Sequence, residues 1–366
     1  MIRIMSYFKM IFLLLFYALF LVCSCTNSKN TKTDNPVYMG VLKHNVVDIG
    51  DDFIGNGGML AIYQDTIIGV DFTLTSQVPP FYCLKPERKS LSFYHFGSKG
   101  QGPNEFLEPY SIQCINTNIV GTYDRNTGTY YEFTVPSEKE KLKINKKIRF
   151  ENRRLDLATK TAFNQHIGLN RGGGESMFIL ADSMGKTVNM LFDYPYKNND
   201  ERERFDNKRR FFAYQGSLAV NPSKTKLAYT ARNGDIIHFY SIENNTIQLI
   251  AKIENEYPIY SDPHNPIVPT ANATMTLSVM LSPESLRGYV AIYATEQFVY
   301  ALFNGTKLEE KKLEEATILR VFDWNGNLVK VYDLDIPSRS LCVSDDDSKL
   351  WTIAVEPEIS LVYFEF

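Results

Sequence analysis

The feature that most constrains this chain is a long succession of short apolar runs, each bounded by turn residues. From about residue 58 onward, runs such as GMLAIY (58–63) and DIIHFYS (235–241) follow one another, and together they are rich in Val, Ile, Thr, Tyr and Phe. Such β-branched and aromatic residues suit the half-buried surface of a strand. The runs 317–324 and 327–334 flank Asn325-Gly326, and Asn-Gly between apolar runs is a strong hairpin signal. About two dozen such runs predict an all-β chain.

An internal repeat indicates how these strands are arranged. Residues 217–220 (SLAV) align without a gap on 340–343 (SLCV), and the same offset places Tyr240 on Tyr363. Similar meanders of about four runs recur, and the chain after the tether described below divides into six units of about 55 residues. Radial repetition of meanders is the architecture of a β-propeller. We therefore expect an all-β, six-bladed β-propeller with four-stranded antiparallel blades, closed by the run 359–366 pairing with an N-terminal strand.

Two other all-β architectures are weaker alternatives. A pair of β-sandwiches should show a linker near the middle, and no Pro-, Gly- or Ser-rich break lies there; a β-helix needs a shorter, stricter period. Helical signals are few. The run 307–316 (KLEEKKLEEA) predicts a short solvated helix or a charged insertion within a hairpin. The alternating charges of 199–210 (NDERERFDNKRR) predict an exposed loop.

The N-terminus has the organisation of a secretory signal. Arg3 and Lys9 precede the uncharged segment 10–22, which is too short for a membrane-spanning helix and fits a signal-peptide core. The segment 22–25 (VCSC) then resembles a bacterial lipobox, with Cys25 as the lipidated residue. The alternative is an ordinary secretory signal that leaves Cys25 as a plain thiol.

We therefore expect a signal peptide at 1–24, a flexible tether at 25–36 that begins with the lipidated cysteine, and the propeller at 37–366. More than one acyl chain makes such an anchor stable, so the membrane is an expected partner and the location is the outer membrane of the cell envelope. The tether contains only Asp34 as an acidic residue, whereas export signals of surface lipoproteins resemble an acidic cluster. This favours the periplasmic face over the cell surface.

Composition excludes several classes of function. Lys and Arg number 39 against 42 Asp and Glu, a net charge of −3, so we expect no nucleic-acid partner. Cys83, Cys114 and Cys342 lie far apart without CxxC spacing, and the five His residues are scattered. We expect these three cysteines to be small buried hydrophobes, and we expect no metal site or cofactor.

One loop has a distinctive spacing of glycines. Residues 97–106 (GSKGQGPNEF) lack both the end of a P-loop and the glycine order of a dinucleotide fingerprint. They predict a tight crossing between strands or blades, in which glycines supply positive φ and an aromatic side chain returns to the core. The alternative is a ligand-facing loop whose N–H groups hold an anion. The candidate residues are Gly97, Gly100, Gly102, Pro103, Glu105 and Phe106.

This loop resembles the GxxGxGPxEF segment of the TolB-like six-bladed β-propeller lipoproteins, which are common in Bacteroidetes. Residues 288–305 (GYVAIYATEQFVYALFNG) are similar to a strand segment of that family's fifth blade, and 321–331 (VFDWNGNLVKV) to its Asn-Gly hairpin. Asn104 departs from the pattern, which often has Gly there. The resemblance implies a propeller fold and an envelope location, but no reaction, because it brings no established enzymatic activity.

The sequence shows no catalytic constellation. GxSxG, HExxH and the Asp-box turn of propeller glycosidases are absent, and 345–347 (DDD) predicts a solvated turn because the Gly and distal Glu of a calcium loop are missing. Two hypotheses remain. The first is a lipid-anchored binding or scaffold module for an envelope protein or glycan. The second is a metal-dependent propeller hydrolase, either a lactonase or a glycan-cleaving enzyme.

Overall fold

The computed structural model describes residues 36–73, 77–86, 91–172, 176–264, 274–275, 279–310 and 315–366. The expected signal peptide, Cys25 and all but the last residue of the expected tether lie outside these ranges.

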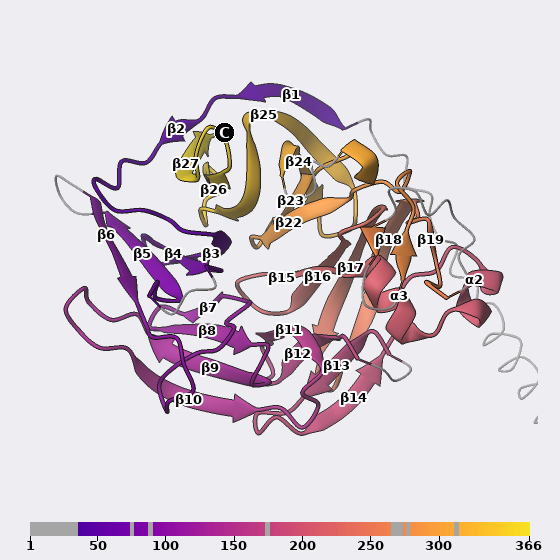
Figure 1. Ribbon diagram of the computed structural model, residues 1–366, viewed down its shortest axis with the longest axis horizontal. Helices are drawn as coiled ribbons and strands as arrows, with labels where there is room; N and C mark the ends of the chain where they lie inside the picture. Colours follow the sequence, from indigo (N-terminus) through magenta and orange to yellow (C-terminus); the bar gives the residue numbers. More distant parts are fainter. Residues whose placement is uncertain are drawn as a thin grey trace, which may run out of the picture. The chain divides into compact units, whose positions relative to one another are not determined.

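Four antiparallel sheets of four strands follow one another along the chain, and the first strand of each faces the centre of the propeller (Figure 1). We number these sheets as blades 1 to 4. Blade 1 contains β3 (Gly57–Tyr63), β4 (Thr66–Asp71), β5 (Phe81–Pro86) and β6 (Leu91–Phe96). Blade 2 contains β7 (Gln113–Asn116), β8 (Ile119–Asp124), β9 (Thr129–Thr134) and β10 (Lys143–Arg149). Blade 3 contains β11 (Leu155–Lys160), β12 (His166–Asn170), β13 (Phe178–Ala181) and β14 (Thr187–Leu191). Blade 4 contains β15 (Gly216–Val220), β16 (Lys226–Ala231), β17 (Asp235–Glu243) and β18 (Thr246–Glu256).

Blades 5 and 6 share one long strand, β25 (Leu328–Val343). Residues 328–333 of this strand pair with β24, and residues 341–343 pair with β26. Blade 5 therefore contains β22 (Tyr289–Ala294), β23 (Phe298–Phe303), β24 (Ala316–Asp323) and the first part of β25. Blade 6 contains the last part of β25, β26 (Lys349–Ala354), β27 (Ser360–Glu365) and β2 (Asn45–Val46). The expected six-bladed, all-β propeller is confirmed, and the repeated segments 217–220 and 340–343 are the inner strands of blades 4 and 6.

Strands from distant parts of the chain close the propeller. β2 pairs antiparallel with β27, Asn45 opposite Tyr363, and the Val47 N–H donates to the Leu361 carbonyl at 2.9 Å. β1 (Val37–Leu42) runs parallel to β25 on the outer side of blade 5, with Val37 opposite Lys330. The closing strand predicted at 359–366 is thus confirmed as the partner of an N-terminal strand.

Within the described residues the core consists of six hydrophobic clusters, and each lies between two successive blades. Strands in the middle of a blade are buried on both faces: all six residues of β4 and all five of β12 are buried. The outermost strand β10 instead alternates between exposed residues and residues that are half-buried or, at Ile148, buried. This pattern follows because each blade packs against a neighbour on both of its faces, so only its outer edge meets solvent.

The chain between blades 3 and 4 corrects one prediction. The segment 199–210 is not a loop but contains helix α2 (Asn199–Arg204) and the start of α3 (Asn207–Tyr214). Asn198 caps α2 by accepting from the Glu201 N–H, and Asp206 caps α3 by accepting from the Arg209 N–H. These caps are the helix-start signals that outweigh the alternating charges.

Two smaller insertions complete the fold. The three short strands β19 (Tyr260–Ser261), β20 (Thr274–Met275) and β21 (Met280–Leu281) form a separate sheet between blades 4 and 5. In the charged run 307–316, a 3-10 turn spans Leu308–Glu310, Leu308 is buried, and residues 311–314 lie outside the described ranges. No helix in the described part of the chain is both long enough and apolar enough to cross a membrane.

Candidate functional site

A cavity of about 690 Å³ lies along the axis of the propeller. Its walls come from the inner strand of every blade, in agreement with the arrangement in Figure 1. The segments that line it are 56–62, 110–117, 156–159, 215–222, 289–294 and 339–341. Its size falls within the range of pockets that bury small ligands.

Three arginines gather at one end of this cavity. Each blade begins with its inner strand, so the six inner strands run in one direction and their first residues meet at the same end. Arg339 begins the inner strand of blade 6, Arg125 lies in the turn after β8, and Arg232 follows β16 directly. All three line the cavity, and we call this the arginine end.

Arg125 is held by carboxylates. Its guanidinium forms an ion pair with Glu108 and a second with Asp156 at 3.2 Å, and it lies 4.2 Å from the centre of the Tyr110 ring. Although burial opposes the charge, these contacts raise the pKa of Arg125. Two carboxylates thus compensate this one cation.

Arg232 and Arg339 differ from Arg125, because neither forms an ion pair within the described ranges. Arg339 donates to the Asn56 side-chain oxygen at 2.8 Å, and its buried Nε has no hydrogen-bond partner there. The backbone of Arg232 is fixed instead: its N–H donates to Gln215 at 2.7 Å, and its carbonyl accepts from Gly288 at 2.9 Å. The arginine end therefore holds two half-buried arginines that form no ion pair with a carboxylate of the described residues.

Gly288 allows this close approach of blades 4 and 5. A Cβ atom at this position would lie 2.0 Å from the Gly234 carbonyl oxygen and 2.7 Å from that of Ala231. Any other residue would separate the two blades and move Arg232 with them.

Asp156 is the carboxylate that lines the cavity at this end. Burial raises its pKa, while Arg125, Arg171 and Arg232 oppose the rise. The other carboxylate that lines the cavity is Asp345, in the turn after β25, and thus at the opposite end.

The opposite end contains a lysine in place of arginines. Lys224 extends its ammonium from blade 4 to the Ile115 carbonyl of blade 2, at 2.9 Å, and to Pro222 at 3.0 Å. Its turn is held by Glu296 of blade 5, which accepts from the Asn221 amide at 2.9 Å. Side chains of blades 4 and 5 and a backbone carbonyl of blade 2 therefore converge at this end.

The glycine loop crosses from blade 1 to blade 2 at the arginine end. Gly97 and Gly100 have φ of +83° and +157°. The Glu105 carboxylate accepts from the Gly102 N–H at 2.7 Å. Phe106 is fully buried, 5.0 Å from the Phe81 ring and 4.9 Å from Tyr131. Pro103 lies in the same turn.

This loop also sets the position of the cavity's Arg125. Directly after Phe106, the N–H groups of Leu107 and Glu108 both donate to one oxygen of the buried Asp124, at 2.7 and 3.0 Å. Glu108 then reaches Arg125. None of the loop residues predicted from the sequence lines the cavity, but the loop holds a residue that does.

Sequence reasoning missed the residues at the arginine end. Tyr110, Arg125, Asp156, Arg232 and Arg339 are spread over five-eighths of the chain, about 230 residues. They follow no motif, and only the circular arrangement of inner strands brings them together. Tyr110 lies near the predicted glycine loop, Arg232 directly after the apolar run KLAYTA (226–231) and Arg339 directly before the repeated segment 340–343, but the sequence marked none of them as a binding residue.

Comparison with known proteins identifies the family. The model of the family described as TolB-like 6-blade propeller-like matches residues 56–346. The chain belongs to the TolB-like six-bladed propellers. No curated protein sequence matches it. Among solved structures, a Bacteroides fragilis protein described as exported has a TM-score of 0.52 at 12% identity, with 88% of this chain and 94% of that chain covered. The Cps50 (Swd1) propeller of Myceliophteria thermophila has a TM-score of 0.48 at 10% identity, with 88% and 99% covered.

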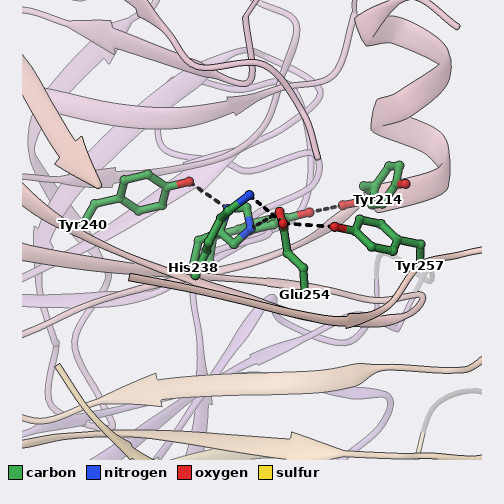
Figure 2. Close-up of polar contacts among 7 residues, drawn as sticks. Tyr214, His238, Tyr240, Glu254 and Tyr257 are labelled. Carbon is green, nitrogen blue, oxygen red and sulfur yellow. Dashed lines mark hydrogen bonds and ion pairs between the residues drawn. The ribbon is translucent and has the colours of Figure 1, made fainter. Parts of the chain in front are cut away.

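The TolB-like propeller also contains a buried polar network in blade 4 (Figure 2). His238 lies between the Tyr240 hydroxyl, at 3.0 Å, and the Glu254 carboxylate, at 2.9 Å, and Tyr257 donates to Glu254 at 3.0 Å. Burial raises the pKa of Glu254, but hydrogen bonds from His238 and Lys252 lower it to about 2. Tyr240 is 1% and His238 6% exposed, so a substrate cannot reach them, and the network fastens β18 to β17.

Of the remaining predicted positions in the TolB-like propeller, Cys114 and Asp345 line the cavity, whereas Cys83, Cys342 and Asp346 do not. Cys83 and Cys342 are buried and Cys114 is half-buried, and all three are free. Asp346 accepts hydrogen bonds from Ser344 and Ser348 in an exposed turn. The described ranges contain no group of three or more His, Cys, Asp or Glu residues placed to hold a metal ion.

Proposed function

We propose that this TolB-like propeller is a lipid-anchored binding protein of the cell envelope, and that its axial cavity receives part of an envelope glycan. The observation that carries the proposal is a cavity of about 690 Å³ at the centre of six blades, lined by polar and aromatic side chains. A protein partner would need a broad surface, whereas a cavity of this size suits one small group.

The chemistry of the lining supports a saccharide. Amide side chains from Asn56 and Gln215 line the cavity and can pair with hydroxyl groups. The Phe72 ring, which stacks on Tyr110 with ring centres 5.3 Å apart, adds an aromatic group to the wall. The Oγ of Ser340 and the Nε atoms of Arg125 and Arg339 are buried without a partner in the described part of the chain. Buried polar atoms usually have partners, so a bound ligand is a natural source of them.

The envelope location is supported by two independent lines. The N-terminal sequence has the pattern of a lipobox at Cys25, and a protein of similar fold from Bacteroides fragilis is described as exported. We expect Cys25→Ala to move the protein from the membrane to the soluble fraction, while Cys23→Ala leaves it with the membrane. Equal fractionation of the two variants would contradict the anchor.

Binding is tested with the full-length protein in detergent on an array of neutral and acidic envelope oligosaccharides. Ser217→Trp, which places an indole inside the cavity from β15, should abolish binding. Ser137→Trp, at an exposed turn, is the matched control and should bind as the wild type does. Binding that survives Ser217→Trp would place the glycan site elsewhere.

A further inference from the structure

The charges of the arginine end indicate what kind of glycan the cavity accepts. Of the three arginines, only Arg125 has carboxylate partners, Glu108 and Asp156. Arg232 and Arg339 form no ion pair in the described ranges, although Arg232 attracts the Asp156 carboxylate that Arg125 already binds. An uncompensated charge taken partly out of water is costly unless an opposite charge joins it. The cavity therefore has an excess of positive charge at the arginine end.

The two arginines face the same space from different blades. Arg232 follows the second strand of blade 4, and Arg339 begins the inner strand of blade 6, so the inner strand of blade 5 lies between them. Tyr289 begins that strand. Its hydroxyl is already bound to Asp235 at 2.8 Å and to Arg320 at 3.1 Å, so it does not compete for the anion.

Hydrogen bonds position the backbone of Arg232 and the guanidinium of Arg339 before any ligand arrives. Gln215 and Gly288 hold the backbone of Arg232, and Asn56 holds one guanidinium nitrogen of Arg339. A planar guanidinium has five N–H donors, so donors of both remain available. Planar forks of this kind match the two oxygens of a carboxylate or a sulfate.

We propose that the cavity binds an acidic saccharide, and that Arg232 and Arg339 hold its carboxylate or sulfate group while Arg125, neutralised by Glu108 and Asp156, shapes the wall. This inference rests on the proposed function, because it specifies the ligand of the same cavity. Glu108 and Asp156 keep the third arginine from the anion, so the anionic group is directed to the side of blades 4 to 6.

The test uses calorimetry on the full-length protein in detergent with four probes: digalacturonate, a sulfated disaccharide, neutral digalactose and inorganic sulfate. We expect at least one acidic disaccharide to bind about tenfold or more tightly than digalactose, as expected for a hydrogen-bonded charge pair. The two acidic probes distinguish carboxylate from sulfate. Inorganic sulfate that binds as tightly as the sulfated disaccharide would overturn the saccharide part of the inference.

Variants assign the interaction to residues. Arg232→Gln and Arg339→Gln should each weaken the acidic disaccharide about tenfold or more and leave digalactose unchanged. Arg232→Lys, which keeps the charge but loses the fork, should recover part of the loss. Arg149→Gln, on the exposed outer strand β10, is the matched control. Thermal unfolding of each variant verifies that it folds.

The failures of the two proposals are distinguishable. If acidic and neutral disaccharides bind alike, and only Ser217→Trp abolishes both, the cavity binds glycans but the charge inference is wrong. If no oligosaccharide binds and only inorganic sulfate does, both proposals are wrong.

Discussion

The buried imidazole of His166 should make this propeller sensitive to mild acid. The ring is 1% exposed at the boundary of blades 2 and 3, with its centre 4.7 Å from the Tyr130 ring and 5.5 Å from Phe150. Burial, with a smaller effect of Lys160, lowers the pKa of His166 from 6.5 to about 3. Between these values the unfolded chain binds a proton and the folded chain does not, so the free energy of unfolding falls as the pH falls from about 6.5 to about 3.

The size of the effect follows from the pKa difference. Each pKa unit corresponds to about 1.4 kcal/mol, so His166 costs the folded state about 2 kcal/mol at about pH 5 and about 5 kcal/mol once the pH is below about 3. The substitution His166→Phe keeps an aromatic ring between the same neighbours and removes the titration. The pH-dependent loss of stability should shrink by about 2 kcal/mol between about pH 7.5 and pH 5.

Urea unfolding followed by tryptophan fluorescence measures this difference for both proteins at each pH. Between about pH 7.5 and pH 8.5 neither folded nor unfolded His166 is protonated, so the gap between the two proteins should stay constant there. If His166→Phe and the wild type lose the same free energy between about pH 7.5 and pH 5, the imidazole is not the acid-sensitive group and the reasoning is refuted.

Three further predictions concern stability. Phe106→Ala should lower the free energy of unfolding by about 3–5 kcal/mol, whereas Phe163→Ala, at a ring 44% exposed, should change it little. Equal losses for the two variants in urea unfolding would show that the buried Phe106 ring does not anchor the glycine loop in the core. Gly100→Ala should cost about 1–3 kcal/mol, because its Cβ would lie 2.1 Å from a Glu105 oxygen, and a fully stable variant would show that the loop adapts. Glu254→Gln should reduce the fall in the free energy of unfolding between about pH 4.5 and pH 2. The lowered pKa of Glu254 stabilises the fold above that range, and this stabilisation disappears as the carboxylate is protonated. Urea unfolding of both proteins across this pH range tests the prediction.

Local patterns predicted much of the architecture. Asn325-Gly326 sits in the hairpin between β24 and β25, with Gly326 at φ +83°, because positive φ is a property of the turn itself. The repeat of 217–220 at 340–343 marked equivalent inner strands, because each blade solves the same packing problem. The prediction of a loop at 199–210 was wrong because it relied on the alternating charges and overlooked the helix caps at Asn198 and Asp206, which are single residues.

The sequence by itself determined the class of fold, the number of blades and the resemblance to the TolB-like propellers, because strand length, turn chemistry and repeat period are local properties. Only the tertiary structure decided where a ligand could bind. Arg125, Arg232 and Arg339 belong to three different blades, and they meet because six inner strands with one direction surround a common axis. The same closure determined which arginine is neutralised: the crossing after Phe106 brings Glu108 to Arg125 and leaves Arg232 and Arg339 without an ion pair among the described residues.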